Sequence, residues 1–199
     1  MTNVECCSGV CVKRPTNGFG ARRGNAAFTL IELIVVTAVI IILTGLVLST
    51  VGYVQKKGAR ARAETEIAAI SAACESYKAD NGVYPTDAST TEVLNSTTSF
   101  NPTNYQSASL YLYKQLSGDA TGNRQPSGKS YMTFKPKMLL PAPPSTATVT
   151  AIADPFGNSY GYSTMMAATG SGGYNPTFDL WSTANGTTSN DVPKWIKNW

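Results

Sequence analysis

A membrane-length apolar run with a carboxylate inside it constrains this chain more than any other feature. The run extends from Phe28 to Leu48, and Glu32 lies near its start. As an α-helix the run would span about 32 Å, which is enough to cross a hydrocarbon core of about 30 Å. An ionisable side chain inside such a span is energetically unfavourable, so Glu32 is a candidate functional residue.

Two interpretations of Glu32 are open on physical grounds. Cleavage of the chain just before Phe28 would create a new α-amine. A neighbouring copy packed alongside could present that amine to Glu32, which would neutralise both charges. The carboxylate would also lie in the first helical turn, where a negative charge interacts favourably with the helix dipole. Alternatively, Glu32 lies near the membrane interface, protonated or reaching toward water, and has no special partner.

Basic residues lie on both sides of the apolar run. The formal net charge is +4, and residues 1–27 hold four basic residues against one acid. The rest of the chain is nearly neutral, so the charge pattern gives no support for nucleic-acid binding. Lys56, Lys57, Arg60 and Arg62 follow the run and match the basic residues ahead of it. The positive-inside rule therefore does not decide the orientation of the span.

The chain offers few candidates for metal or nucleophilic chemistry. It has no His, and Cys6, Cys7 and Cys11 precede the run at a spacing that fits no zinc site. Cys74 falls on the apolar face of a predicted helix, where a free Cys behaves as a small hydrophobic residue. The sequence has no phosphate-binding loop, no Gly-x-Ser-x-Gly motif and no His-based triad, so we expect no enzyme.

Three isolated acids, Asp119, Asp154 and Asp179, stand beside turn residues. Residues 154–158 read Asp-Pro-Phe-Gly-Asn, in which Asp and Asn bond nearby backbone, Pro restricts φ and Gly permits a positive φ. This segment is predicted to be a turn. We expect the three acids to lie at turns or on the strand surface rather than in a catalytic site.

The helix that begins at Phe28 is predicted to continue beyond the membrane. Apolar residues recur at three- and four-residue steps through Ile67, Ile70, Cys74 and Tyr77, which is typical of an amphipathic helix. No Pro occurs between residues 28 and 83, and Gly82 suits the position just past a helix end. We therefore predict one long helix over residues 28–82, with residues 28–51 as its membrane-spanning part.

The remaining residues, 83–199, are predicted to form a small globular head. This head would cover the apolar stripe formed by Ile67, Ile70, Cys74 and Tyr77. Residues 111–116 favour a short helix, and the proline-dense segment 136–144 favours a loop. Short aromatic runs at 160–162 and 178–181 favour strands of an antiparallel sheet. The predicted fold class is α+β, with one long amino-terminal helix packed by a small antiparallel sheet.

The segment Ala27-Phe28-Thr-Leu-Ile-Glu32-Leu-Ile-Val-Val36 resembles the processing signal of type IV pilins and type II secretion pseudopilins. The resemblance implies a pilin-like fold, removal of a basic leader and N-methylation of the new terminus. In this chain the cleavage would fall between Ala27 and Phe28, and the methylated residue would be Phe28. The family usually has Gly before the cut, where this chain has Ala27. Glu32 matches the acidic fifth position, to which the resemblance assigns a role in assembly.

The head resembles the major, or G-type, pseudopilins of type II secretion. The similar segments are residues 77–85, 154–162, 178–182 and 198–199, whereas residues 95–150 match poorly and are predicted to be a variable loop. The resemblance also implies a calcium site after the last strand. The positions that correspond to the family's acidic calcium ligands are Asn185, where the family usually has Asp, and Asp191. One carboxylate would hold calcium weakly. The favoured alternative is a polar loop held by Asx turns and by packing of Trp195 and Trp199.

The resemblance implies a structural subunit of a type II secretion pseudopilus. A prepilin peptidase would remove leader 1–27, and the single-pass chain would wait in the cytoplasmic membrane with its head outside the cytoplasm. An inner-membrane assembly platform and its ATPase would then build a helical filament from copies of this chain, together with minor pseudopilins. Residues 28–51 would form the core of this periplasmic fibre, and its growth would push exported proteins outward.

Two other functions stay open from the sequence. A type IV pilin or minor pilin, serving adhesion, motility or DNA uptake, would share the processing signal. The head lacks a Cys pair and carries the pseudopilin-like segments, which favours the pseudopilin. A membrane-anchored periplasmic domain that never polymerises would instead keep residues 1–27 joined to Phe28.

Overall fold

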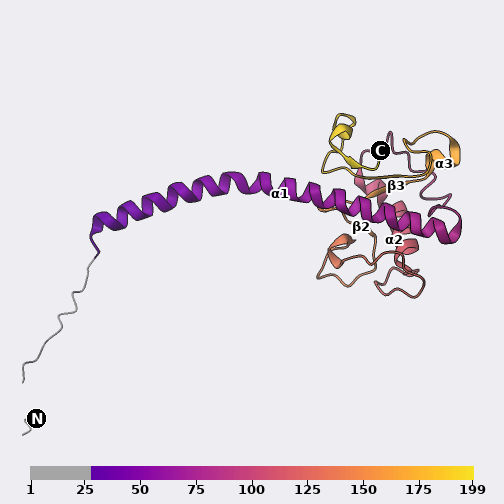
Figure 1. Cartoon of the computed structure of the whole chain (residues 1–199), viewed down its shortest axis with the longest axis horizontal. Helices are drawn as coiled ribbons and strands as arrows, with labels where there is room; N and C mark the ends of the chain where they lie inside the picture. Colours follow the sequence, from indigo (N-terminus) through magenta and orange to yellow (C-terminus); the bar gives the residue numbers. More distant parts are fainter. Residues whose placement is uncertain (1–27) are drawn as a thin grey trace, which may run out of the picture. The chain divides into compact units, whose positions relative to one another are not determined.

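The computed structural model describes residues 28–199 (Figure 1). The predicted leader, with Ala27 and the three leader cysteines, lies outside the described residues. The chain divides into two compact units, Met1–Leu48 and Ser49–Trp199. The second unit contains the head, in which the later part of the long helix lies beside short helices and two small sheets (Figure 1).

The long helix α1 comprises Leu30–Asn81. From its start to Leu48 every side chain is exposed, and almost all of them are apolar. Thr37 and Thr44 donate their hydroxyls to backbone carbonyls one turn earlier, at 3.0 and 2.7 Å. These polar groups are thus satisfied within the helix, as a lipid environment requires. By length and composition α1 contains a segment that could cross a membrane.

The later part of α1 buries the predicted apolar stripe. Ile67, Ile70 and Cys74 are buried, and burying a large aliphatic side chain contributes about 1.5–3 kcal/mol. Burial raises the pKa of the Cys74 thiol to about 12, which agrees with its predicted role in the core. Gly82 adopts a φ of 78° and donates its N–H to the carbonyl of Lys78 at 2.7 Å. The stripe and the glycine cap are both confirmed.

Helix α2, Gln106–Ser117, begins earlier than the predicted helix at 111–116. A 3-10 helix, Pro102–Tyr105, leads directly into it. Asn101 caps that turn, because its side chain accepts a hydrogen bond from the N–H of Thr103 at 3.1 Å. The cap and the following proline start the helical segment before the apolar residues on which the sequence prediction relied.

The predicted strands form a three-stranded antiparallel sheet in the order β3-β4-β5. β3 is Gly161–Ser163, β4 is Asp179–Ser182 and β5 is Ile196–Lys197. A short helix, α3, Met165–Thr169, follows β3. The two aromatic runs are therefore strands, as predicted, and the carboxyl-terminal segment supplies the third.

A second sheet corrects the prediction for residues 136–144. This segment is not a loop throughout, because it contains the 3-10 helix Pro136–Met138 and strand β1, Leu139–Leu140. β1 pairs antiparallel with β2, Ala151–Ile152. Leu139 lies opposite Ile152 in the register and both are buried, so apolar burial overrides the proline-rich composition. The α+β, pilin-like fold class is confirmed.

Two hydrophobic clusters hold the head together. The first joins the α1 stripe to α2 and to the strands. The second surrounds the fully buried ring of Trp181, which stacks on Trp195 with ring centroids 6.2 Å apart and meets Tyr105 edge-on at 5.0 Å. Offset and edge-on ring pairs of this kind add stability beyond the buried area alone.

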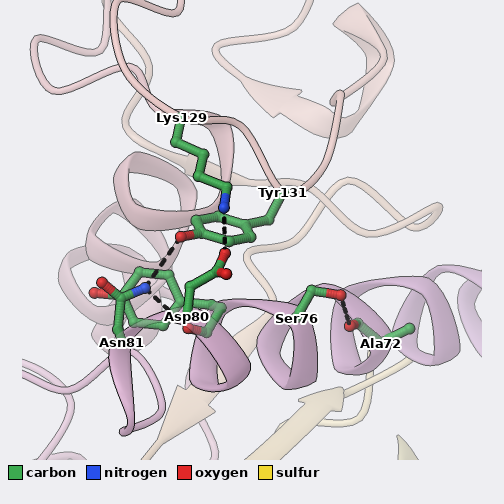
Figure 2. Close-up of polar contacts among 7 residues, drawn as sticks. Ala72, Ser76, Asp80, Asn81, Lys129 and Tyr131 are labelled. Carbon is green, nitrogen blue, oxygen red and sulfur yellow. Dashed lines mark hydrogen bonds and ion pairs between the residues drawn. The ribbon is translucent and has the colours of Figure 1, made fainter.

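Part of the predicted variable region is fastened to the end of α1 (Figure 2). Lys129 forms an ion pair with Asp80, and Asn81 donates its side-chain amide to the hydroxyl of Tyr131 at 3.1 Å. The ring of Tyr131 also meets that of Tyr77 edge-on, with centroids 5.3 Å apart. This part of the predicted variable loop is therefore held against the end of α1.

Asp119 and Asp154 lie beside turns, as predicted, and Asp179 begins strand β4, but its expected position on the strand surface is wrong. Asp119, Asp154 and Asp179 are all buried. The carboxylate of Asp179 accepts hydrogen bonds from the Ser96 hydroxyl at 2.5 Å and from the N–H of Tyr174 at 2.8 Å. Charged acceptors of this kind hold loop backbone that would otherwise be buried without a partner.

The Asp154 carboxylate holds the predicted turn from inside. It accepts hydrogen bonds from the N–H groups of Phe156 and Asn158 at 3.0 and 2.8 Å, and Gly157 adopts a φ of 90°. The Ser182 hydroxyl of β4 donates to it at 2.5 Å. Burial raises the pKa of Asp154, and these hydrogen bonds act against that rise. The carboxylate thus connects the turn to β4.

Candidate functional site

Glu32 forms a reciprocal cap with Thr29 at the start of α1. The Glu32 carboxylate accepts hydrogen bonds from the Thr29 N–H at 2.9 Å and from the Thr29 hydroxyl at 2.7 Å. In return, the N–H of Glu32 donates to the Thr29 hydroxyl oxygen at 3.3 Å. This is the capping-box arrangement, which the spacing Thr-x-x-Glu could have indicated from the sequence. The sequence analysis missed Thr29.

The cap engages only one of the two Glu32 oxygens. Both hydrogen bonds from Thr29 reach Oε2. Within residues 28–199, Oε1 accepts no hydrogen bond. Phe28 is 86% exposed beside it, at the start of the described chain. One oxygen thus orients the side chain, and the other is available to a further donor.

The loop after β4 brings the two predicted calcium ligands into different contacts. Asn185 adopts a φ of 70°, and its side-chain carbonyl accepts a hydrogen bond from the Asn158 amide at 2.7 Å. Asp191 accepts from the Thr188 hydroxyl at 2.7 Å and from the Lys194 ammonium at 3.0 Å. The Thr188 and Lys194 hydrogen bonds lower the pKa of Asp191.

In this structure protein donors occupy the side-chain oxygens that a calcium ion would use. Calcium requires six to eight oxygen ligands, whereas both carboxylate oxygens of Asp191 are bonded to protein donors, one of them cationic. Over residues 28–199, no group of three or more His, Cys, Asp or Glu side chains could hold a metal ion. The indole N–H of Trp195 donates to the Gly186 carbonyl at 3.2 Å. The contacts agree with the alternative of a polar loop held by hydrogen bonds and tryptophan packing.

A second carboxylate that the sequence analysis missed lies on the head part of α1. Glu66 is half-buried and accepts a hydrogen bond from the Tyr160 hydroxyl at 2.9 Å. Burial raises the pKa of Glu66, and the nearby Asp154 carboxylate adds to this rise. The pair joins the helix to the residue that precedes β3. Because the partners are far apart in the sequence, no local pattern could have identified them.

One protein family and one curated protein, both of type II secretion, are similar to this chain. Residues 50–131 match the family described as "Type II secretion system (T2SS), protein G". The curated protein "Type II secretion system core protein G" of Vibrio cholerae serotype O1 (strain ATCC 39315 / El Tor Inaba N16961) is 34% identical over 102 residues. The matched part is 51% of this chain and 68% of that relative. No solved structure matches the chain.

A long helix with an apolar first part, packed later by a small antiparallel sheet, defines a pilin-like subunit. With the similarity just described, the chain belongs to the type II secretion system protein G family, the major pseudopilins. It is a structural subunit of the pseudopilus, as the resemblance implied, and the family is one of structural subunits rather than enzymes. The apolar part of α1 and the family together fit a protein anchored in the inner membrane.

Proposed function

We propose that the chain is cut between Ala27 and Phe28 by a prepilin peptidase and N-methylated at Phe28. The mature subunit then polymerises with each Glu32 facing the Phe28 amine of a neighbour. The observation that carries this proposal is an exposed carboxylate on the apolar first part of α1, with one oxygen oriented by Thr29. In a bundle of such helices an amine is the partner that best offsets the cost of enclosing the charge.

The proposal gives each segment of the chain a role. Residues 1–27 are the removed leader, residues 28–51 are the single membrane span and later the fibre core, and residues 83–199 are the head outside the cytoplasm. The fully exposed apolar surface of α1 up to Leu48 supports this division, because a side-chain surface of that kind needs either lipid or other helices to cover it.

The proposed partners follow from the family. An assembly platform in the inner membrane, with its ATPase, draws subunits out of the bilayer and adds them to a helical filament that also contains minor pseudopilins. Growth of the filament pushes exported proteins outward. Membership of the protein G family supports the pseudopilin over the type IV pilin and over the non-polymerising domain. Experiments on processing and on fibre formation can distinguish these two alternatives from the pseudopilin.

The test of processing is the mass and amino-terminal sequence of the protein recovered from membranes that contain the peptidase. We expect the wild-type chain to begin at N-methylated Phe28. The control is Ala27→Leu, which places a bulky residue where the family has a small one and should keep residues 1–27. A wild-type protein that retains those residues in the presence of an active peptidase would overturn the proposal.

A further inference from the structure

We propose that Lys56, Lys57 and Arg62 form a basic collar that binds the anionic headgroups of membrane phospholipids. The inference deepens the proposed function, because it requires that the apolar part of α1 is anchored in a bilayer. It concerns what holds the subunit at the membrane surface before assembly. The partner is the lipid surface itself rather than another protein.

The collar is a concentration of positive charge in which no residue forms an ion pair within residues 28–199. Residues 55–62 contain four basic side chains and no acid. Lys56, Lys57 and Arg62 are exposed. None of the three makes a side-chain hydrogen bond or an ion pair within residues 28–199. Arg62 lies close enough to Glu66 to lower the pKa of that carboxyl, which acts against the rise caused by burial.

Arg60, the fourth basic residue of this segment, differs from the collar residues because it bonds to other parts of the head. Arg60 donates from its guanidinium to the carbonyl of Lys194 at 2.7 Å and lies 3.5 Å from the Glu64 carboxylate. It therefore fastens α1 to the carboxyl-terminal segment of the head. The collar residues have no such contact, so their charge is available to an external partner.

The collar follows the membrane span at the distance of a headgroup layer. In an α-helix, Lys56 lies about 7.5 Å beyond Val51, the end of the proposed span, and long helical side chains lean toward the amino terminus. Their ammonium groups therefore reach back toward the bilayer, whose polar layers extend the thickness from about 30 to about 40–45 Å. Tyr53 and Val54 are exposed between span and collar, and Tyr suits the membrane interface.

The arrangement of the charges also fits a surface that surrounds the helix. At 100° per residue, Arg62 lies about 240° around α1 from Lys56, and Lys57 about 100°. The cations therefore face different sides rather than one groove. A partner subunit with carboxylates would meet one side, whereas the headgroups of a bilayer encircle a spanning helix. Each Lys or Arg close to an anionic lipid surface is attracted to it electrostatically.

The test uses the full chain inserted in bilayers of phosphatidylcholine mixed with phosphatidylglycerol. The protein is released in lipid-bearing particles, and the retained phospholipids are counted by mass spectrometry. The variant Lys56→Gln/Lys57→Gln removes two collar charges. The matched control, Lys135→Gln/Lys137→Gln, removes two exposed charges from the head. Each variant is also measured at high salt, which screens electrostatic attraction.

We expect the wild type and the control to retain phosphatidylglycerol in about twofold excess over its share of the bilayer, and the collar variant to lose that excess. High salt should abolish the excess in all. Equal enrichment in the collar variant and the wild type would overturn the proposal, as would a variant that loses self-association while its lipid selectivity is unchanged. A wild-type chain that does not insert at all would instead contradict the proposed function.

Discussion

Tyr160 donates its hydroxyl to Glu66 at 2.9 Å and thereby joins the residue before β3 to the head part of α1. The carboxylate is half-buried, and its pKa is raised by burial above the ordinary value of 4.5. A raised pKa means that the folded state holds the proton more tightly than the unfolded state. The contribution of Glu66 to stability is therefore largest below pH 4.5 and declines as the pH rises through its folded-state pKa.

The first prediction follows from that sign. Glu66→Gln keeps an acceptor for Tyr160 but cannot ionise, so its free energy of unfolding should fall less than that of the wild type between pH 4.5 and neutrality. The measurement is denaturant unfolding of the full chain in micelles, followed by the fluorescence of the head tryptophans. As control, Tyr160→Phe removes the donor and should destabilise the head by about 1 kcal/mol. Identical pH profiles for Glu66→Gln and the wild type would contradict this account.

Two glycines should respond to alanine in opposite directions. A Cβ added at Gly161 would lie 2.2 Å from the ring of Trp181, which is fully buried. Gly161→Ala should therefore destabilise the head by about 1–3 kcal/mol or more. A Cβ at Gly58 meets nothing within 4 Å on the exposed side of α1, so Gly58→Ala should stabilise the helix by roughly 0.5–1 kcal/mol. The same denaturant unfolding measures both variants. An unchanged free energy of unfolding for Gly161→Ala would contradict the close contact between Gly161 and the Trp181 ring.

The loop after β4 should be insensitive to calcium. Asp191 is already paired with Lys194 and Thr188, so neither added calcium nor a chelator should change the unfolding temperature of the wild-type chain. Magnesium at the same concentration controls for general ionic effects. A rise of several degrees with calcium alone would contradict the contacts described for this loop and restore the metal site that the resemblance implied.

The cap at the start of α1 makes a prediction about local stability. Thr29→Val removes the hydroxyl that donates to Glu32 and accepts from its N–H. Hydrogen exchange of the Glu32 amide should accelerate roughly fivefold, because its N–H loses the hydroxyl acceptor that holds the first turn closed. The matched control is Thr37→Val, whose hydroxyl bonds a carbonyl inside the same helix. Equal acceleration in both variants would show that the cap has no specific role.

Local patterns predicted the parts of the fold that depend on neighbouring residues. The stripe through Ile70 and Cys74, the glycine cap at Gly82 and the turn at 154–158 all follow from short spacings, and the structure confirms them. Strand β1 was missed because its burial depends on a partner strand that follows later in the chain.

The buried polar groups were missed for the same physical reason. Asp154 is paired with Ser182, and Asp179 with Ser96, across long stretches of sequence. A lone aspartate beside turn residues looks the same in the sequence whether it faces water or the interior. The partner that makes its burial tolerable is supplied only by the folded chain. Thr29 is different, since its spacing to Glu32 is local and the capping pattern was available.

The pairing of Glu32 with the terminus of a neighbouring subunit is the central claim, and fibre yield tests it most directly. Glu32→Ala and the control Thr44→Ala are expressed with the complete secretion machinery, and the amounts in the membrane and in sheared fibres are measured separately. The account predicts that both variants insert as the wild type does, that Thr44→Ala forms fibres normally, and that Glu32→Ala forms few or none. Fibres of Glu32→Ala at the wild-type yield would contradict it.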